Sequence, residues 1–173
     1  GFDIALYYSL TNTFGNFNFS LNIAKLEKFK QTAGNDFIKL IEAQESGVIP
    51  KELSISGFSD LLKKDGSPEI QANIKFIWNK GSWGLGLFAK HIGEFYESRN
   101  RLSDGRLWKV KAYNTINGHV DYHFNLNSSN SRIRLGINNI ADERAPLASD
   151  IFGYYFDKHD NLGRYYYIDL SYK

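Results

Sequence analysis

The sequence of 173 residues predicts an all-β fold, in which about seven antiparallel strands form a segment of a transmembrane β-barrel. Three observations predict it. Apolar and polar residues alternate with the two-residue period of a strand along seven segments. The connections between these segments alternate between short and long, as they do at the two ends of an outer-membrane barrel. On one face of each segment, the run of apolar residues is not interrupted by a charge, which is what contact with lipid requires.

The first two strands are predicted at Phe2–Leu10 and Phe17–Phe29. Every second residue is apolar throughout the first and, in the second, as far as Ile23. The short connection Thr11–Gly15 joins them as a hairpin. The residues between the apolar ones are mainly polar, as in a sheet with one hydrated face.

The longest connection, Lys30–Pro68, contains a predicted helix over Asp36–Gly47. Asp36 is expected to be its N-cap, and Gly47 with the following Pro50 is expected to end it. Such a helix is expected to pack the loop and not to bind a ligand.

The third and fourth strands are predicted at Glu69–Asn79 and Ser82–Tyr96, joined by an Asn-Lys-Gly-Ser turn. Trp78 and Trp83 flank this turn on the apolar face. Tryptophan at one end of a strand pair is typical of the aromatic girdle at a membrane interface.

The long connection Glu97–Lys111 holds a group of basic and aromatic residues that we consider a candidate ligand-binding region. These cations suit an anionic ligand such as a ferric chelate, or the phosphates of lipopolysaccharide. The alternative is a solvated surface loop with a turn at Asp104-Gly105. The candidate residues here are Arg99, Arg101, Arg106 and Trp108.

The fifth and sixth strands are predicted at Ala112–Leu126 and Arg132–Asn138, joined by the short connection Asn127–Ser131. Their polar faces are expected to line a water-filled lumen. Arg132 and Arg134 on the sixth strand could each pair with Asp121 on the fifth. Neighbours on one face of a strand lie about 6.5–7 Å apart, too far to chelate one metal ion tightly. The predicted lumen-lining residues are His119, Asp121, His123, Arg132 and Arg134.

The end of the chain combines three motifs. Residues Asn138–Pro146 read Asn-Asn-Ile-Ala-Asp-Glu-Arg-Ala-Pro, a Gly-Tyr loop follows at Gly153, and the last strand, Arg164–Lys173, begins after Gly163. This ending resembles the C-terminus of TonB-dependent outer-membrane receptors. In that comparison Asp142 and its neighbour Glu143 belong to a structural segment, and the aromatic loop residues Tyr154 and Tyr155 are further ligand-binding candidates.

The resemblance implies that residues 1–173 are the C-terminal part of a receptor whose 22-stranded barrel follows an N-terminal plug. Such a receptor lies in the outer membrane of a Gram-negative bacterium and imports a scarce nutrient, with a ferric siderophore or similar chelate the expected ligand. Its partners would be outer-membrane lipid, the small-molecule ligand and, through the N-terminal part, TonB. No cofactor is implied.

Composition agrees with a piece of a longer membrane protein. The chain has no methionine, so we expect it to be processed or cut from a larger precursor. It has no cysteine for a disulfide, a thiolate metal site or a thiol nucleophile. A net charge of +2 is too small to indicate a nucleic-acid partner.

Two other function classes stay open. An outer-membrane barrel enzyme of the lipase or protease type would need a nucleophile motif such as Gly-x-Ser-x-Gly, which the sequence lacks; we therefore expect no enzyme activity. A soluble β-rich binding module would also show alternation, with its apolar face buried under a second layer.

Overall fold

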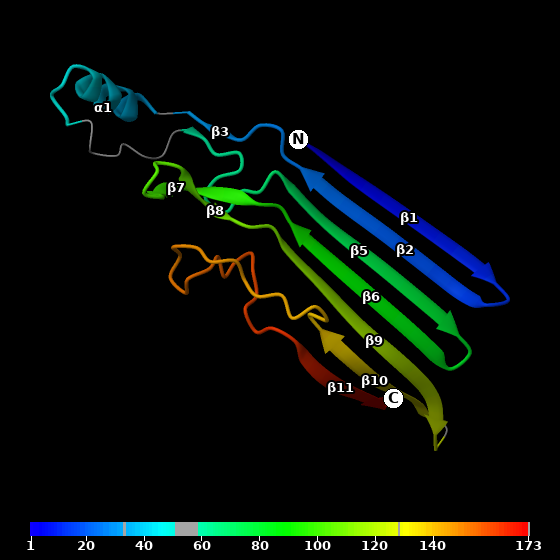
Figure 1. Ribbon diagram of the computed structural model, residues 1–173. Helices are drawn as coiled ribbons and strands as arrows, with labels where there is room; N and C mark the ends of the chain where they lie inside the picture. Colours follow the sequence, from blue (N-terminus) through cyan, green and yellow to red (C-terminus); the bar gives the residue numbers. More distant parts are fainter. Residues whose placement is uncertain (33, 51–58, 128, 173) are drawn as a thin grey trace.

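The computed structural model describes residues 1–32, 34–50, 59–127 and 129–172. Within these ranges the chain is built mainly of antiparallel strands, with a single helix (Figure 1). The strands of the main sheet are β1 (Phe2–Asn12), β2 (Gly15–Lys25), β5 (Ile70–Lys80), β6 (Trp83–Ile92), β9 (Tyr113–Leu126), β10 (Ser129–Asn138) and β11 (Tyr165–Tyr172).

The main sheet has seven strands in the order β1-β2-β5-β6-β9-β10-β11, and every neighbouring pair is antiparallel. The prediction of seven antiparallel strands is therefore confirmed. The sheet is twisted and open, with β1 and β11 as its two edges (Figure 1). It does not close on itself.

The largest differences from the predicted strands are in the second and the fourth. The second strand ends at Lys25 and not at residue 29. The fourth predicted strand is interrupted after Ile92, because the N–H of Gly93 turns to the carbonyl of Ile70. The chain then forms a separate hairpin from β7 (Phe95–Arg101) and β8 (Leu107–Val110), which takes in the end of the predicted strand and most of the predicted long connection Glu97–Lys111.

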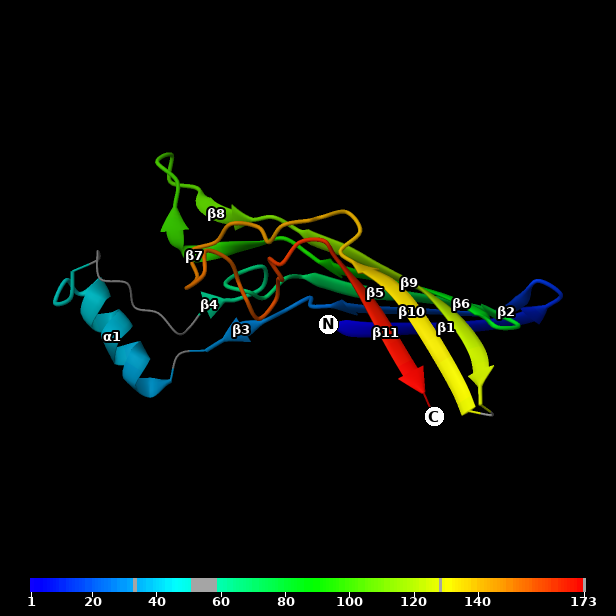
Figure 2. The same cartoon turned by 90° about the horizontal axis from the view of Figure 1, so that it is seen from below.

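The two ends of the sheet differ as expected from the lengths of the connections (Figure 2). At one end, tight turns join β1 to β2 and β5 to β6. Gly81 in the second turn has φ +55°, a conformation that favours glycine. At the other end lie all the long connections, with β7, β8 and the short strands β3 (Lys30–Gln31) and β4 (Ser59–Asp60). We call these the turn end and the loop end.

The helix α1 (Asn35–Glu45) lies at the loop end and extends away from the sheet (Figure 2). Its N-cap is Gly34, so the prediction that Asp36 caps it is wrong; Asp36 lies in the first helical turn. None of its residues is buried. In the described part of the chain, no helix is long and apolar enough to cross a membrane.

One face of the main sheet is apolar and uncovered. The register places the predicted apolar residues of all seven strands on this face; Leu21, for example, lies between Leu6 and Ile74. The exposed fractions are 51% for Leu6, 40% for Ile74 and 69% for Ile168. Within the described ranges no helix or second sheet packs on this face (Figure 2).

The buried core of the chain lies at the loop end. Ile92, Phe95, Val110 and Tyr113 are the fully buried apolar residues of the described chain. They come from β6, from the β7–β8 hairpin and from the start of β9. This core holds the hairpin against the sheet, while the rest of the sheet is a single layer.

Candidate functional site

The polar face carries a ladder of charged residues on β9, β10 and β11. In the register, Arg132 lies opposite His123 and Arg134 lies opposite Asp121. His119 lies one step further along the same face. The structure thus brings all five predicted lumen-lining residues together on one surface.

Asp121 is the centre of this ladder. Its carboxylate is buried and accepts two hydrogen bonds from Arg134, from Nε at 2.6 Å and from Nη2 at 2.9 Å. Nε2 of His119 lies 3.7 Å from the same carboxylate. The other arginine, Arg132, bonds instead to Asp169 on β11 at 2.6 Å. The described residues contain no group of three or more side chains placed to hold a metal ion.

Small residues make room for the rings of this face. A Cβ on Gly86 would overlap the imidazole of His119, and one on Gly136 would overlap the ring of Tyr167. Each glycine lies directly opposite the residue whose ring covers it. The two rings therefore occupy the space above a glycine of the neighbouring strand.

A cleft of about 330 Å³ opens on the polar face where the strands reach the loop end. The segment 156–163 forms one wall, and strands β6, β9, β10 and β11 form the floor. Its lining combines a cation, a hydroxyl, amides and aromatic rings, which suits a small polar ligand. Principal lining residues are Lys90, Thr115, Asn117, Asn138, His159 and Tyr165.

His159 anchors the wall of the cleft and is 3% exposed. Its ring is parallel to that of Phe95, with 6.1 Å between the centroids, and its other contact is edge-on with Tyr113 at 5.1 Å. Neither ring nitrogen has a hydrogen-bond partner. Burial, with a smaller contribution from nearby Lys90, lowers the pKa of His159 to about 4, so the ring is neutral at pH 7.

We expect acid to loosen this wall. The folded-state pKa lies below the ordinary value of 6.5, so the unfolded segment binds the proton more tightly. The stabilisation is therefore complete above about pH 6.5 and declines as the pH falls toward 4, by about 3 kcal/mol in total. Hydrogen exchange of segment 150–163 measured between pH 7 and pH 4.5 should show progressive opening.

The matched variant is His159→Leu, which fills the same apolar site without a titrating group. It should keep the segment closed at pH 7 and remove most of the pH dependence. His91→Gln, at a half-buried histidine on the opposite face, should leave the profile of this segment unchanged. A His159→Leu profile identical to that of the native chain would contradict the assignment.

The predicted cations of the β7–β8 hairpin make local contacts. Arg106 bonds to Asp104 at 2.6 Å, and its hydrogen bonds lower the pKa of that carboxyl. Arg101 donates to the carbonyl of Gly105 at 2.9 Å. Arg99 lies in β7, but its side chain is outside the described part of the structure. Arg101 and Arg106 are therefore each held by partners within the hairpin.

The aromatic candidates serve mainly to join the loops. Trp108 donates from Nε1 to the carbonyl of Leu147 at 3.0 Å, which ties the hairpin to the β10–β11 connection. Tyr155 packs edge-on against Phe95 at 5.0 Å, and burial raises its pKa to about 12. The ring of Tyr154 lies 6.4 Å from that of Phe152.

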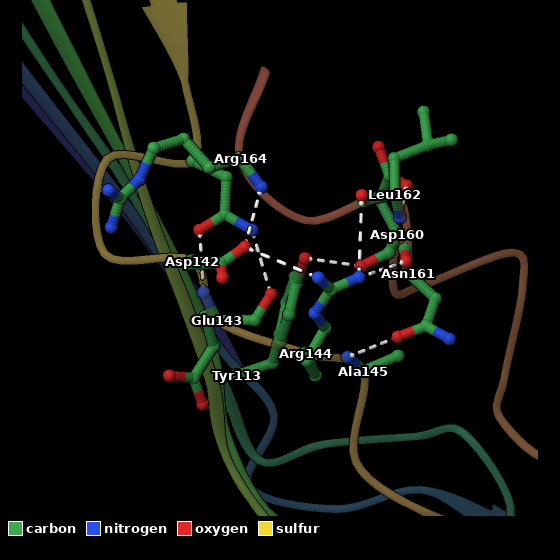
Figure 3. A network of polar contacts seen from close by, with 10 residues as sticks. Tyr113, Asp142, Glu143, Arg144, Ala145, Asp160, Asn161, Leu162 and Arg164 are labelled. Atoms are coloured by element: carbon green, nitrogen blue, oxygen red, sulfur yellow. Dashed lines mark hydrogen bonds and ion pairs between the residues drawn. The ribbon is translucent and has the colours of Figure 1, made fainter.

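A clamp that the sequence analysis did not detect closes the base of the β10–β11 connection (Figure 3). The carboxylate of Asp142 accepts a hydrogen bond from the backbone N–H of Arg164 at 2.7 Å. Arg144 donates to the carbonyl of Asn161 at 3.2 Å, and the side chain of Asn161 accepts from the N–H of Ala145 at 3.2 Å. These bonds set where β11 begins, in agreement with the structural role expected for Asp142.

Asn139 stabilises the turn that contains Asp142. Asn139 is 5% exposed, and its side chain bonds to both the N–H and the carbonyl of Glu143, at 2.9 and 2.7 Å. Asn139 and Asp142 adopt positive φ values of 52° and 55°, which these residue types tolerate better than most. The Asn-Asn-Ile-Ala-Asp motif therefore indicated a turn. The residues after Asp160 that Asp142 and Arg144 bind could not be predicted from it.

Comparison of the chain with protein-family models, with curated proteins and with solved structures gave no match.

Proposed function

We propose that this chain is the C-terminal part of an outer-membrane receptor that imports a scarce nutrient, most simply a ferric siderophore or similar chelate. Its strands would form part of a transmembrane β-barrel, and its long connections would lie at the outer surface of the cell. The observation that carries the proposal is the apolar face: it is continuous over seven strands, and nothing in the described chain covers it.

Lipid is the cover that fits this face. Exposed apolar patches of soluble monomers seldom exceed a few hundred Å². Here large apolar side chains are exposed on six of the seven strands and half-buried on β2, and the opposite face carries the ion pairs of Arg132 and Arg134. A strand with lipid on one side and water on the other requires this division.

The open edges support a larger barrel. In hydrocarbon each unpaired backbone group costs several kcal/mol, so β1 and β11 would need neighbouring strands. The resemblance of the C-terminal motifs to TonB-dependent receptors implies a barrel of 22 strands. A plug that contacts TonB would then belong to another part of the protein.

The cleft beside His159 gives the proposed receptor a place for ligand. It lies on the polar face, hence on the lumen side, and at the loop end, hence toward the outside. Lys90 borders it and donates to the carbonyl of Lys158 at 3.2 Å. A ligand at this position would contact the barrel wall and the β10–β11 connection together.

Single-cysteine labelling tests the membrane assignment, and the chain contains no native cysteine to interfere. Spin labels at successive positions of β5, in the intact protein in lipid vesicles, should alternate between exposure to lipid and exposure to water. Positions 72, 74 and 76 should collide mainly with oxygen dissolved in lipid, and positions 73, 75 and 77 with a water-soluble nickel chelate. Uniform access of the chelate to both sets would reject the proposal.

Uptake tests the transport assignment. Cells with and without the intact protein are given radioactive iron as a ferric hydroxamate, and separately a ferric catecholate. Accumulation that depends on both the protein and the membrane potential supports an iron-chelate receptor. Equal accumulation of both chelates in the two strains would exclude them as ligands.

A further inference from the structure

A row of lysines lies on the apolar side of the sheet, at the loop end. Lys25 ends β2 opposite Ile70, so it lies on the same face as the apolar residues. Nζ of Lys63 lies 2.5 Å from Oε2 of Glu69, and Nζ of Lys25 lies 3.8 Å from Oε1 of the same carboxylate. One glutamate therefore holds two ammonium groups at the upper edge of the apolar face.

A groove of about 290 Å³ connects these charges to the apolar face. It is lined by Lys63, Glu69, His91 and Glu94, together with Ile70 of the apolar face. Nδ1 of His91 lies 2.7 Å from Oδ1 of Asn114, which faces it from β9. The groove is polar where it meets the loops and apolar where it meets the strands.

A third lysine extends the row. Nζ of Lys109 on β8 lies 2.7 Å from Oε2 of Glu94, which lines the groove. The three lysines outnumber the two carboxylates that hold them, Glu69 and Glu94. The opposite boundary of the face is different: among the described residues there, Lys80 is the only charged one, and its Nζ lies 6.0 Å from the ring of Phe14.

We infer that the groove binds the phosphate of a phosphorylated glycolipid, whose acyl chains lie along the apolar face below it. The inference rests on the proposed membrane location and adds a lipid partner to it. Ammonium groups bind phosphate as point charges, and an amphiphile also needs apolar surface directly beneath its headgroup. Lys25 and Lys63 provide the ammonium groups, and Ile70, which pairs with Lys25, begins the apolar surface beside them.

Glu69 distinguishes a lipid site from a structural ion-pair cluster. If the cluster only stabilises the loops, and lipid binding depends on those loops, losing either partner of the ion pair weakens lipid binding. Lys63→Gln and Glu69→Gln would then change the affinity in the same direction. If the lysines bind phosphate, Glu69 competes with that phosphate. Lys63→Gln should then weaken lipid binding, whereas Glu69→Gln should strengthen it.

The experiment is native mass spectrometry of the intact protein in neutral detergent, titrated with lipid A and with the same lipid after removal of its phosphates. We expect preferential retention of the phosphorylated form. Lys63→Gln should weaken its binding about fivefold, and Lys25→Gln with Lys63→Gln about 25-fold. Glu69→Gln should tighten it several-fold. Lys80→Gln, at the turn end, is the matched control and should change nothing.

Three results would overturn the inference. Equal binding of the two lipids would show that phosphate is not recognised, and parallel weakening in Lys63→Gln and Glu69→Gln would show a structural cluster. Displacement of lipid A by an equal concentration of inorganic phosphate would show a free-anion site. These results leave the membrane assignment intact, whereas a protein that is monodisperse without detergent and retains neither lipid would contradict that assignment as well.

Discussion

Replacing Ile74 and Ile168 together by lysine should prevent the intact protein from folding into lipid. Both side chains lie on the apolar face, 40% and 69% exposed, on strands too far apart to share a contact. A lysine in the middle of a lipid-facing strand costs about 2–4 kcal/mol, and distant sites are roughly additive. The expected loss is therefore about 4–8 kcal/mol, which is comparable to the whole stability of many domains. Urea unfolding in phospholipid vesicles measures it.

The matched control places the same charge on the other face. Gln71 and Asn73 belong to β5, as Ile74 does, and their side chains are exposed on the polar face. Gln71→Lys with Asn73→Lys should shift the unfolding midpoint only slightly, because these lysines would remain hydrated. Similar losses in the two double variants would mean that lipid does not cover the apolar face.

What the sequence predicted well was local. The two-residue period placed the apolar side chains of all seven strands on one face, because alternation depends only on neighbouring residues. The ion pair between Arg134 and Asp121 could also be predicted, because the short connection between β9 and β10 limits the register of these two strands. The partner of Arg132 was not, because Asp169 follows a long connection that leaves the register open.

What the sequence did not predict depends on contacts between distant segments. The interruption of the fourth predicted strand at Gly93 depends on the hydrogen bond from its N–H to the carbonyl of Ile70, which lies on another strand. His159 lies in a segment whose sequence predicts an exposed loop, yet its side chain is buried against Phe95 and Tyr113. The candidate cleft therefore includes residues that the sequence analysis did not propose, while the proposed ligand-binding residues Arg101 and Arg106 make local contacts in the hairpin.

The apolar face of the sheet and the clamp before β11 determine different features of the fold. In the proposed barrel, a uniform apolar face would specify which side meets lipid but not where the final strand starts. For β11 that choice is made by Asp142 and Arg144, which bind the backbone just before the strand. The eight residues of β11 then pair with β10 from Tyr165 to Tyr172. Loss of the clamp should therefore affect the last strand more than the rest of the sheet.

Gly163→Val should release β11 from this position. Gly163 has φ +78°, which costs a residue with a side chain about 1–2 kcal/mol. Its Cβ would also lie 2.6 Å from Cζ of Arg144 and 2.7 Å from Oδ1 of Asp142, so the clamp must open. Loss of hydrogen bonds to these charged groups adds about 1.5–3 kcal/mol, for a total of about 4 kcal/mol. Protease resistance of the C-terminal strand in the refolded intact protein measures the change.

Gly153→Val separates the two causes. Gly153 belongs to the same connection and has φ +77°, but nothing lies within 4 Å of the added Cβ. It should lose only the backbone contribution, about 1–2 kcal/mol. Adding Arg144→Ala to Gly163→Val should cost less than the sum of the single losses, because the arginine that the valine displaces is already gone. Equal losses for Gly153→Val and Gly163→Val, or strict additivity in the double variant, would show that the clamp does not position the last strand.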